Sequence, residues 1–280
     1  MDLLVSTEWL AGELGASDLH IVDATMFLPG GGRDARAEFG FEHIPGAVFM
    51  DLEEVRDTGS GLPNTLPSAE KFASRMQSLG IGDGSRIVVY DNSPLHTAAR
   101  AWWMFTTFGA HKVAVLDGGL AKWKAEGRPV EQGRPQVRHR HFTVWGDLAG
   151  VRDLAAMKAN VESGAEQVVD ARSAERFEGA SPEPRAGMHA GHIPGSRNLP
   201  YGALFNDDGT WKRGDGLRAA FEAAGVDMDR PTVTTCGSGV TAAALLFAAR
   251  LLGKQDVALY DGSWSEWGAR DGTPKETGTA

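Results

Sequence analysis

Two kinds of hydrophobic pattern alternate along this chain. Short runs of β-branched and other apolar residues predict buried strands, the clearest at residues 19–23, 86–91, 112–117 and 231–236. Segments with apolar residues at helical spacing predict helices at residues 8–14, 34–39, 67–76, 98–108 and 242–250. Ser6 or Thr7 is expected to cap the first helix, and Ser68 the third. Such alternation predicts an α/β fold in which helices flank a mostly parallel sheet on both faces.

Four segments of the first half recur, in the same order, in the second half. The matching pairs begin at Ile21 and Val168, His43 and His192, Arg86 and Pro231, and Asp117 and Asp261. Their offsets lie between about 144 and 149 residues, which indicates a tandem duplication of one α/β domain. We place the first domain at residues 1–130, a polar linker with Gly and Pro at 131–148, and the second domain at 149–280.

The composition is that of a soluble globular protein, since 42% of the 280 residues are hydrophobic and 23% are charged. A net charge of −9 argues against nucleic acid or an anionic membrane as the main partner. No apolar run is long enough to span a bilayer, and the N-terminus lacks the pattern of a signal peptide. A single cysteine cannot form an internal disulfide, so we expect a reducing compartment and a cytoplasmic protein.

The one cysteine, Cys236, lies between a predicted strand and a predicted helix and is followed by Gly-Ser-Gly-Val-Thr. Glycines let backbone N–H groups close around an anion, and a helix N-terminus adds partial positive charge, so this loop suits a thiolate. Without such a context a lone cysteine is more often a small buried apolar side chain. We therefore predict that Cys236 is a nucleophile. Ser238 and Thr241 add hydroxyl donors, for which capping of the following helix is the alternative role.

The first repeat lacks this nucleophile. It has Asp91 at the position of Cys236, followed by Asn-Ser-Pro-Leu-His instead of a glycine loop. We expect the first domain to contribute structure and one wall of a cleft. The histidines of the two His-Ile-Pro-Gly segments are expected to make structural hydrogen bonds, and no spacing of His and Cys suggests a metal site or a cofactor.

Together these residues resemble the tandem rhodanese-type sulfurtransferases, and within that family the branch that uses 3-mercaptopyruvate. The resemblance covers the whole chain. It is carried by the Cys-Gly-Ser-Gly-Val-Thr loop, the two His-Ile-Pro-Gly segments and the Asp-Gly-Ser-Trp-Ser-Glu-Trp motif that ends at Trp267. It implies that Cys236 takes sulfur from a small-molecule donor as a persulfide. The acceptor would be a thiol, such as that of thioredoxin, or cyanide.

The loop also bears on the donor. Thiosulfate-specific members of the family carry basic side chains directly after the cysteine, whereas Gly237 and Ser238 are neutral. The resemblance further implies that Arg176 and Arg185 bind the carboxylate and keto group of 3-mercaptopyruvate, a task that suits the paired donors of guanidinium groups. The expected substrate-binding residues are Arg176, Arg185, Gly237, Gly239, Val240 and Thr241.

One position departs from the family pattern. The 3-mercaptopyruvate branch is proposed to use an acid and a histidine, with the loop serine, as a proton relay. Glu53 aligns with the acid, but Asn64 aligns with the histidine. Asparagine cannot act as a base near neutral pH, so the relay does not carry over to this chain, and thiosulfate stays open as an alternative donor.

Two functions of other classes compete with sulfur transfer. A cysteine phosphatase needs an arginine six residues after its cysteine, and that position is Ala242. A non-catalytic docking module would have no use for a cysteine in an open glycine loop. Both alternatives are disfavoured by the residues of this one loop.

Overall fold

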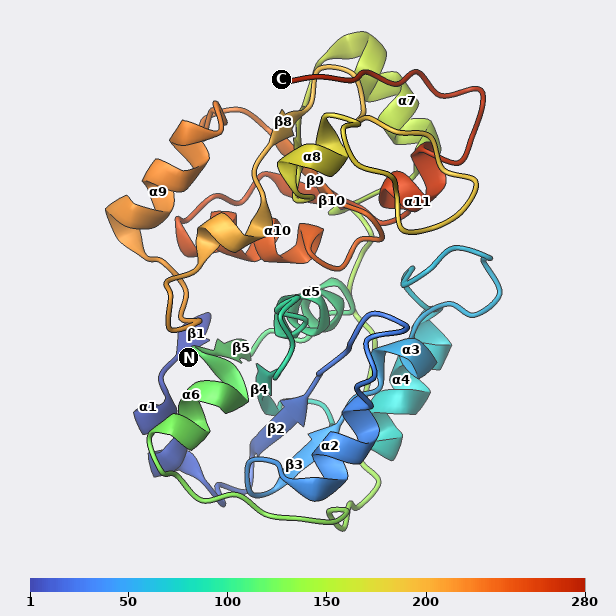
Figure 1. The fold of residues 1–280 in the computed structure, drawn as a ribbon. Helices are drawn as coiled ribbons and strands as arrows, with labels where there is room; N and C mark the ends of the chain where they lie inside the picture. The colour runs from blue at the N-terminus through green and yellow to red at the C-terminus, as the bar shows by residue number, and fades with distance from the viewer. Residues whose placement is uncertain (280) are drawn as a thin grey trace. The chain divides into compact units, whose positions relative to one another are not determined.

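The computed structural model describes residues 1–279, which form two compact units, each built on a five-stranded sheet (Figure 1). The first unit comprises residues 1–58, 66–147 and 207–211, and the second comprises residues 59–65, 148–206 and those from Lys212 onward. Every strand pairing in the two sheets is parallel. The predicted α/β fold with two flanked parallel sheets is therefore confirmed, while the domain boundaries near residues 131 and 149 stay a prediction.

The first sheet has the strand order β1-β5-β4-β2-β3. Its strands are β1 (Leu4–Val5), β2 (Leu19–Asp23), β3 (Ala47–Phe49), β4 (Arg86–Tyr90) and β5 (Val113–Leu116). The helices of this unit are α1 (Thr7–Glu13), α2 (Ala35–Phe41), α3 (Leu52–Val55), α4 (Ala69–Ser78), α5 (Ala98–Thr107) and α6 (Gly119–Ala125). Ser6 caps α1 by accepting a hydrogen bond from the backbone of Trp9, and Ser68 caps α4 in the same way, as the sequence predicts.

The second sheet repeats this plan with the order β6-β10-β9-β7-β8. Its strands are β6 (Val151–Arg152), β7 (Gln167–Asp170), β8 (Arg197–Asn198), β9 (Thr232–Thr235) and β10 (Val257–Tyr260). The helices are α7 (Leu154–Ser163), α8 (Ala174–Phe177), the 3-10 helix η1 (Tyr201–Leu204), α9 (Gly214–Ala223), α10 (Ala242–Leu251) and α11 (Ser263–Trp267).

The strand register shows that the two units are copies of one fold. Asp23 pairs with Tyr90 in the first sheet, and Asp170 pairs with Thr235 in the second. The loops that follow β4 and β9 therefore leave equivalent points of the two sheets. In doubly wound α/β folds this carboxyl edge is where ligands bind.

Both faces of each sheet are covered. In the first unit α1, α2 and α6 pack on one face around Tyr90, while α5 packs against β4 and β5. In the second unit α7 and α11 pack around Val233, and α10 packs against β9 and β10. Residues 242–249 of α10 are all buried, which explains their small and apolar character.

The stretch expected to be a linker makes specific contacts with the first unit. Glu131 forms a backbone bridge with His43. Thr143 donates from its backbone N–H and its hydroxyl to Asp83, and the buried ring of Phe142 contacts that of Phe72. Across residues 1–279, no helix combines the length and hydrophobicity that crossing a membrane requires.

Candidate active site

Cys236 follows directly on β9, the central strand of the second sheet, and its residue is only 2% exposed. The loop from Gly237 to Thr241 leads into α10. The N-terminal turn of a helix presents backbone N–H groups that lack intrahelical acceptors, so it favours an anion nearby. The sequence-predicted order of strand, cysteine, loop and helix is therefore present in the structure.

Helix α11 holds this loop in place. The backbone N–H of Trp264 donates to the Cys236 carbonyl at 2.9 Å. The N–H and the hydroxyl of Ser265 both donate to the Gly237 carbonyl, at 2.9 and 2.5 Å. Cys236 N–H donates to the Ser263 hydroxyl at 3.3 Å. Because α11 satisfies these two carbonyls, they do not face an anion at the sulfur.

Two positions of the loop, 237 and 239, require glycine for different physical reasons. Gly239 has a φ of +79°, in the left-handed region where a side chain adds strain. A Cβ on Gly237 would lie 3.1 Å from Nη2 of Arg176, so the absence of a side chain there lets the guanidinium approach the loop backbone. The predicted residues Arg176 and Gly237 are thus brought together.

A buried ion-pair network positions Arg176. Glu183 accepts from Arg172 at 2.7 Å with one oxygen and from Arg176 at 2.6 Å with the other. Arg172 is itself fully buried against Asp170, with an Nη2 to Oδ2 distance of 2.7 Å. Since Arg172 and Glu183 are both fixed by these contacts, the Arg176 guanidinium has a rigid support.

Arg185 reaches the same loop through a different contact. Its Nη1 donates to the Ser265 hydroxyl at 3.2 Å, and that hydroxyl in turn donates to the Gly237 carbonyl. Arg185 is half-buried, and within residues 1–279 it forms no ion pair. Both predicted arginines therefore contact the cysteine loop or the group that anchors it.

Ser238 receives a hydrogen bond from Asn64, whose Nδ2 lies 3.0 Å from the serine Oγ. Asn64 has a φ of +60°, a conformation that asparagine tolerates better than most residues, and its segment 59–65 belongs to the second unit. With the serine oxygen accepting from an amide, its own proton is available for a donor or an intermediate. Glu53, the other residue of the expected relay region, lies 3.7 Å from Arg56.

The last two loop residues differ in exposure. Val240 is 4% exposed and packs its side chain into the core, so only its backbone can serve a ligand. Thr241 is half-buried and makes no side-chain capping bond to α10. The capping role considered for its hydroxyl is therefore not observed.

Sequence reasoning missed four residues of this site. They are Glu183, Ser263, Ser265 and Tyr201. The two serines lie inside the Asp-Gly-Ser-Trp-Ser-Glu-Trp motif, so the motif itself was the signal. Tyr201 begins η1, and its pKa is raised by burial and by the nearby charge of Cys236. No local pattern marks Tyr201, because only the fold packs η1 against α10, the helix that follows the Cys236 loop.

The equivalent place in the first unit holds an anion of its own. Asp91 accepts from the N–H of Ala98, the first residue of α5, at 2.6 Å and from the N–H of Ser93 at 3.0 Å. Burial raises its pKa to about 6. The Leu120 N–H donates to the Asp91 carbonyl at 3.0 Å, as Trp264 does to Cys236. The carboxylate thus occupies the donors that a substrate anion would need.

The chain is similar to known proteins over nearly its whole length. A family model described as Rhodanese-like domain matches residues 6–126 and 153–270. Human 3-mercaptopyruvate sulfurtransferase is 43% identical over 270 residues, which cover 94% of this chain and 91% of the human protein. Thiosulfate sulfurtransferase of Bos taurus is 44% identical over 284 residues, which cover 98% and 94%.

Among solved structures, the 3-mercaptopyruvate sulfotransferase SseA of Escherichia coli matches with a TM-score of 0.87 and 39% identity. The match covers 95% of this chain and 100% of the SseA chain. Relatives named for two different donors are thus equally similar, so overall identity does not separate the donors. The duplicated parallel sheets, the cysteine loop and these matches agree on one conclusion: the chain belongs to the rhodanese-like family and is a sulfurtransferase with two rhodanese-like domains.

Proposed function

We propose that this enzyme takes sulfur from 3-mercaptopyruvate as a persulfide on Cys236 and releases pyruvate. The observation that carries the proposal is the neutral Cys236 loop with two arginines beside it. Arg176 lies against Gly237, and Arg185 is bonded to the serine that anchors the same residue. These contacts support a thiolate nucleophile and a cationic carboxylate site within one small region of the second unit.

In the first half-reaction the Cys236 thiolate attacks the sulfur of the donor. The new S–S bond forms as the C–S bond breaks, and the electron pair of that bond passes to the CH₂ carbon, giving the enolate of pyruvate. The thiol proton of the donor balances this step by ending on that carbon, which leaves pyruvate and a persulfide anion on Cys236. Backbone N–H groups at the start of α10 stabilise the persulfide charge.

The arginines bind the other end of the donor. The carboxylate and keto oxygens of 3-mercaptopyruvate are planar acceptors, which guanidinium groups bind in pairs. The Ser238 hydroxyl, oriented by Asn64, donates to the developing enolate oxygen or to the sulfur. No histidine is required for this role, because the proton comes from the donor thiol.

In the second half-reaction an acceptor thiol attacks the outer sulfur of the persulfide and leaves with it, which restores the Cys236 thiolate. Thioredoxin or another thiol is the proposed acceptor, and cyanide substitutes for it by forming thiocyanate. A reactive thiol must stay reduced, and we propose a cytoplasmic location on that basis.

The test is mass spectrometry of the intact protein after each donor, with pyruvate measured in parallel. We expect one added sulfur atom with 3-mercaptopyruvate, one pyruvate per enzyme in the absence of acceptor, and neither product in Cys236→Ser. Because the chain has one cysteine, the added sulfur has a single possible thiol. A Cys236→Ser variant with full turnover would refute the mechanism.

Thiosulfate is the second candidate donor, because the bovine thiosulfate sulfurtransferase is as similar to this chain as the human relative. Gly237 and Ser238 place no cation directly after the cysteine, which disfavours a dianion. Comparison of kcat/KM for the two donors decides the matter, and a much larger value for thiosulfate would overturn the choice of 3-mercaptopyruvate.

A further inference from the structure

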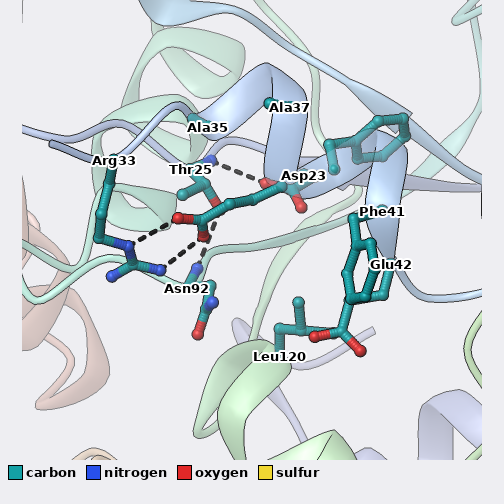
Figure 2. Close-up of a pocket in the computed structure, with 11 residues that line it drawn as sticks. Asp23, Thr25, Arg33, Ala35, Ala37, Phe41, Glu42, Asn92 and Leu120 are labelled. Atoms are coloured by element: carbon teal, nitrogen blue, oxygen red, sulfur yellow. Dashed lines mark hydrogen bonds and ion pairs between the residues drawn. The ribbon is translucent and has the colours of Figure 1, made fainter.

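The first unit contains a cavity of about 420 Å³ at the carboxyl ends of β2 and β4. Figure 2 shows Asp23, Thr25 and Leu120 around it, with Arg33 on one side and Glu42 on the other. The cavity is lined by residues of the first unit, the sequence repeat that lacks the nucleophile. Its size is that of a pocket for a small ligand.

In the second unit a guanidinium of the chain itself is bonded to the corresponding aspartate. The Arg172 guanidinium donates to Asp170 through Nε at 3.0 Å and through Nη2 at 2.7 Å. The same guanidinium lies over the ring of Trp264, 4.4 Å from its centroid. One buried carboxylate thus holds one guanidinium, and an aromatic side chain covers it.

Backbone hydrogen bonds fix which residues correspond. The N–H of Thr25 donates to Asp23 at 2.8 Å, and the N–H of Arg172 donates to Asp170 at 2.9 Å. Leu120 and Trp264 donate to the carbonyls of the equivalent residues Asp91 and Cys236. Thr25 therefore stands where the second unit has Arg172, and Leu120 stands where it has Trp264. Both replacements shorten the side chain.

The first unit keeps the carboxylate of this ion pair, as Asp23, but has Thr25 in place of the arginine. Asp23 is 2% exposed, and its neighbours supply neutral hydrogen-bond donors, namely Thr25 and the Tyr90 hydroxyl. Burial raises its pKa, as expected for a carboxyl group in this setting. A carboxylate offers about four lone-pair sites, so it can accept further bonds from a cation.

The charges around the cavity also favour a cation. Its lining includes three carboxylates, those of Asp23, Glu38 and Glu42, and one guanidinium, that of Arg33. Arg33 makes a two-pronged contact with Glu38 at 2.7 and 2.6 Å, so its charge is neutralised locally. Glu42 is paired with Lys124. The charge that has no oppositely charged partner in this lining is that of Asp23.

We propose that this cavity binds a guanidinium cation on a short aliphatic stem, with the Asp23 carboxylate as its paired acceptor and Leu120 against the stem. The guest takes the place that Arg172 has in the second unit. The proposal concerns the first unit alone and does not depend on which sulfur donor the enzyme uses.

Calorimetric titration with N-butylguanidine tests the proposal, and butylamine serves as the probe of equal charge without the planar fork. We expect saturable binding of butylguanidine and binding of butylamine that is weaker by about tenfold. Asp23→Asn is expected to weaken butylguanidine binding by about 10- to 100-fold, through loss of charge-assisted hydrogen bonds. Asp2→Asn, at an exposed position, is the matched control and should leave binding unchanged.

Two variants that restore the side chains of the second unit complete the test. Thr25→Arg supplies the guanidinium from the chain, and Leu120→Trp supplies the aromatic cover. Thr25→Arg should abolish butylguanidine binding and leave sulfur transfer by Cys236 intact, and Leu120→Trp should strengthen the binding. No saturable binding of butylguanidine, equal binding of butylamine, or undiminished binding in folded Asp23→Asn would each overturn the proposal. N-acetylarginine amide, which mimics an arginine within a peptide chain, distinguishes the source: binding tighter than that of butylguanidine assigns the site to a protein arginine, and weaker binding to a small molecule.

Discussion

Replacement of Arg185 by alanine tests the proposed donor site at the charge that the structure leaves uncompensated. The two positive charges of Arg172 and Arg176 are balanced by two carboxylates. These are Asp170 and Glu183, at ion-pair distances of 2.6 to 2.7 Å. That cluster is neutral as a whole. Among residues 1–279, Arg185 donates to a serine hydroxyl at 3.2 Å and has no carboxylate partner, so its full charge is available to a substrate carboxylate.

The expected loss of kcat/KM in each variant follows from this difference in charge compensation between Arg185 and Arg176. Truncating one partner of a hydrogen-bonded charge pair costs about 2–5 kcal/mol, and the half-buried position of Arg185 favours the lower end. A loss of about 2 kcal/mol lowers kcat/KM for 3-mercaptopyruvate by about 30-fold. Arg176→Ala should cost about tenfold or less, because Glu183 already neutralises much of that charge. Most of both losses should be seen in KM, since binding of the carboxylate is shared by the ground state and the transition state.

The assay is pyruvate release at several concentrations of 3-mercaptopyruvate, with a thiol acceptor in excess. Arg185→Lys keeps the charge but loses the planar fork, so its kcat/KM should lie between those of the wild type and Arg185→Ala. Arg218→Ala, at an exposed position on α9, is the matched control and should match the wild type. Thermal unfolding of each variant verifies that the fold is intact.

Two outcomes would refute this reasoning. An unchanged KM in folded Arg185→Ala would mean that the donor carboxylate binds elsewhere. A larger loss in Arg176→Ala than in Arg185→Ala would mean that the neutral cluster, rather than the uncompensated charge, binds the donor.

Three further predictions concern the Cys236 loop and the equivalent position of the first repeat, Asp91. Asn64→Asp removes the donor to Ser238 and should lower kcat by about fivefold, in line with one hydrogen bond of about 1 kcal/mol; added to Ser238→Ala it should have no further effect, and additive losses would show that Asn64 acts elsewhere. Gly239→Ala, at a φ of +79°, should lower the free energy of unfolding in urea by about 1–2 kcal/mol, whereas Gly216→Ala in α9 should not lower it. Because the pKa of Asp91 is raised from 3.8 to about 6 in the folded state, the protonated carboxyl stabilises the fold at low pH, and this stability is lost as pH rises from about 4 to about 6. The stability of Asp91→Asn relative to wild type should therefore rise by about 2 kcal/mol between pH 4.5 and 7, and a flat difference would contradict the buried carboxyl.

The sequence was sufficient for those parts of the site that depend on local structure. Hydrophobic runs followed by Cys236 or by Asp91 predict strand ends, and the parallel register places both at the same edge of their sheets. The serine caps of α1 and α4 follow from local hydrogen bonding and were equally predictable. The sequence repeat alone shows that the first copy lacks the cysteine, because Asp91 stands at the position of Cys236.

Other parts of the site depend on irregular chain and were not predictable. Glu183 lies in the stretch between α8 and β8, which has no counterpart of similar conformation in the first unit, and its two arginine contacts need the folded loop. Asn64 reaches Ser238 from 174 positions away along the chain. Hydrophobic periodicity carries no information about such contacts, because it reports only which face of an element is buried.

The two copies have the same strand order but different side chains at the strand end. Comparing them indicates which residues the proposed reaction depends on. The carbonyls of Asp91 and Cys236 both accept from the helix that follows the next strand, at 3.0 and 2.9 Å. In the first copy, however, the carboxylate of Asp91 itself takes the N–H of Ala98 at the start of α5, so that helix terminus is already neutralised. In the second copy the side chain is a thiol with no acidic oxygens, and the proposed mechanism uses the start of α10 for a thiolate and then a persulfide. Under that proposal the fold supplies an anion site in both copies, and the residue at the strand end decides whether the site holds the protein's own carboxylate or a reaction intermediate.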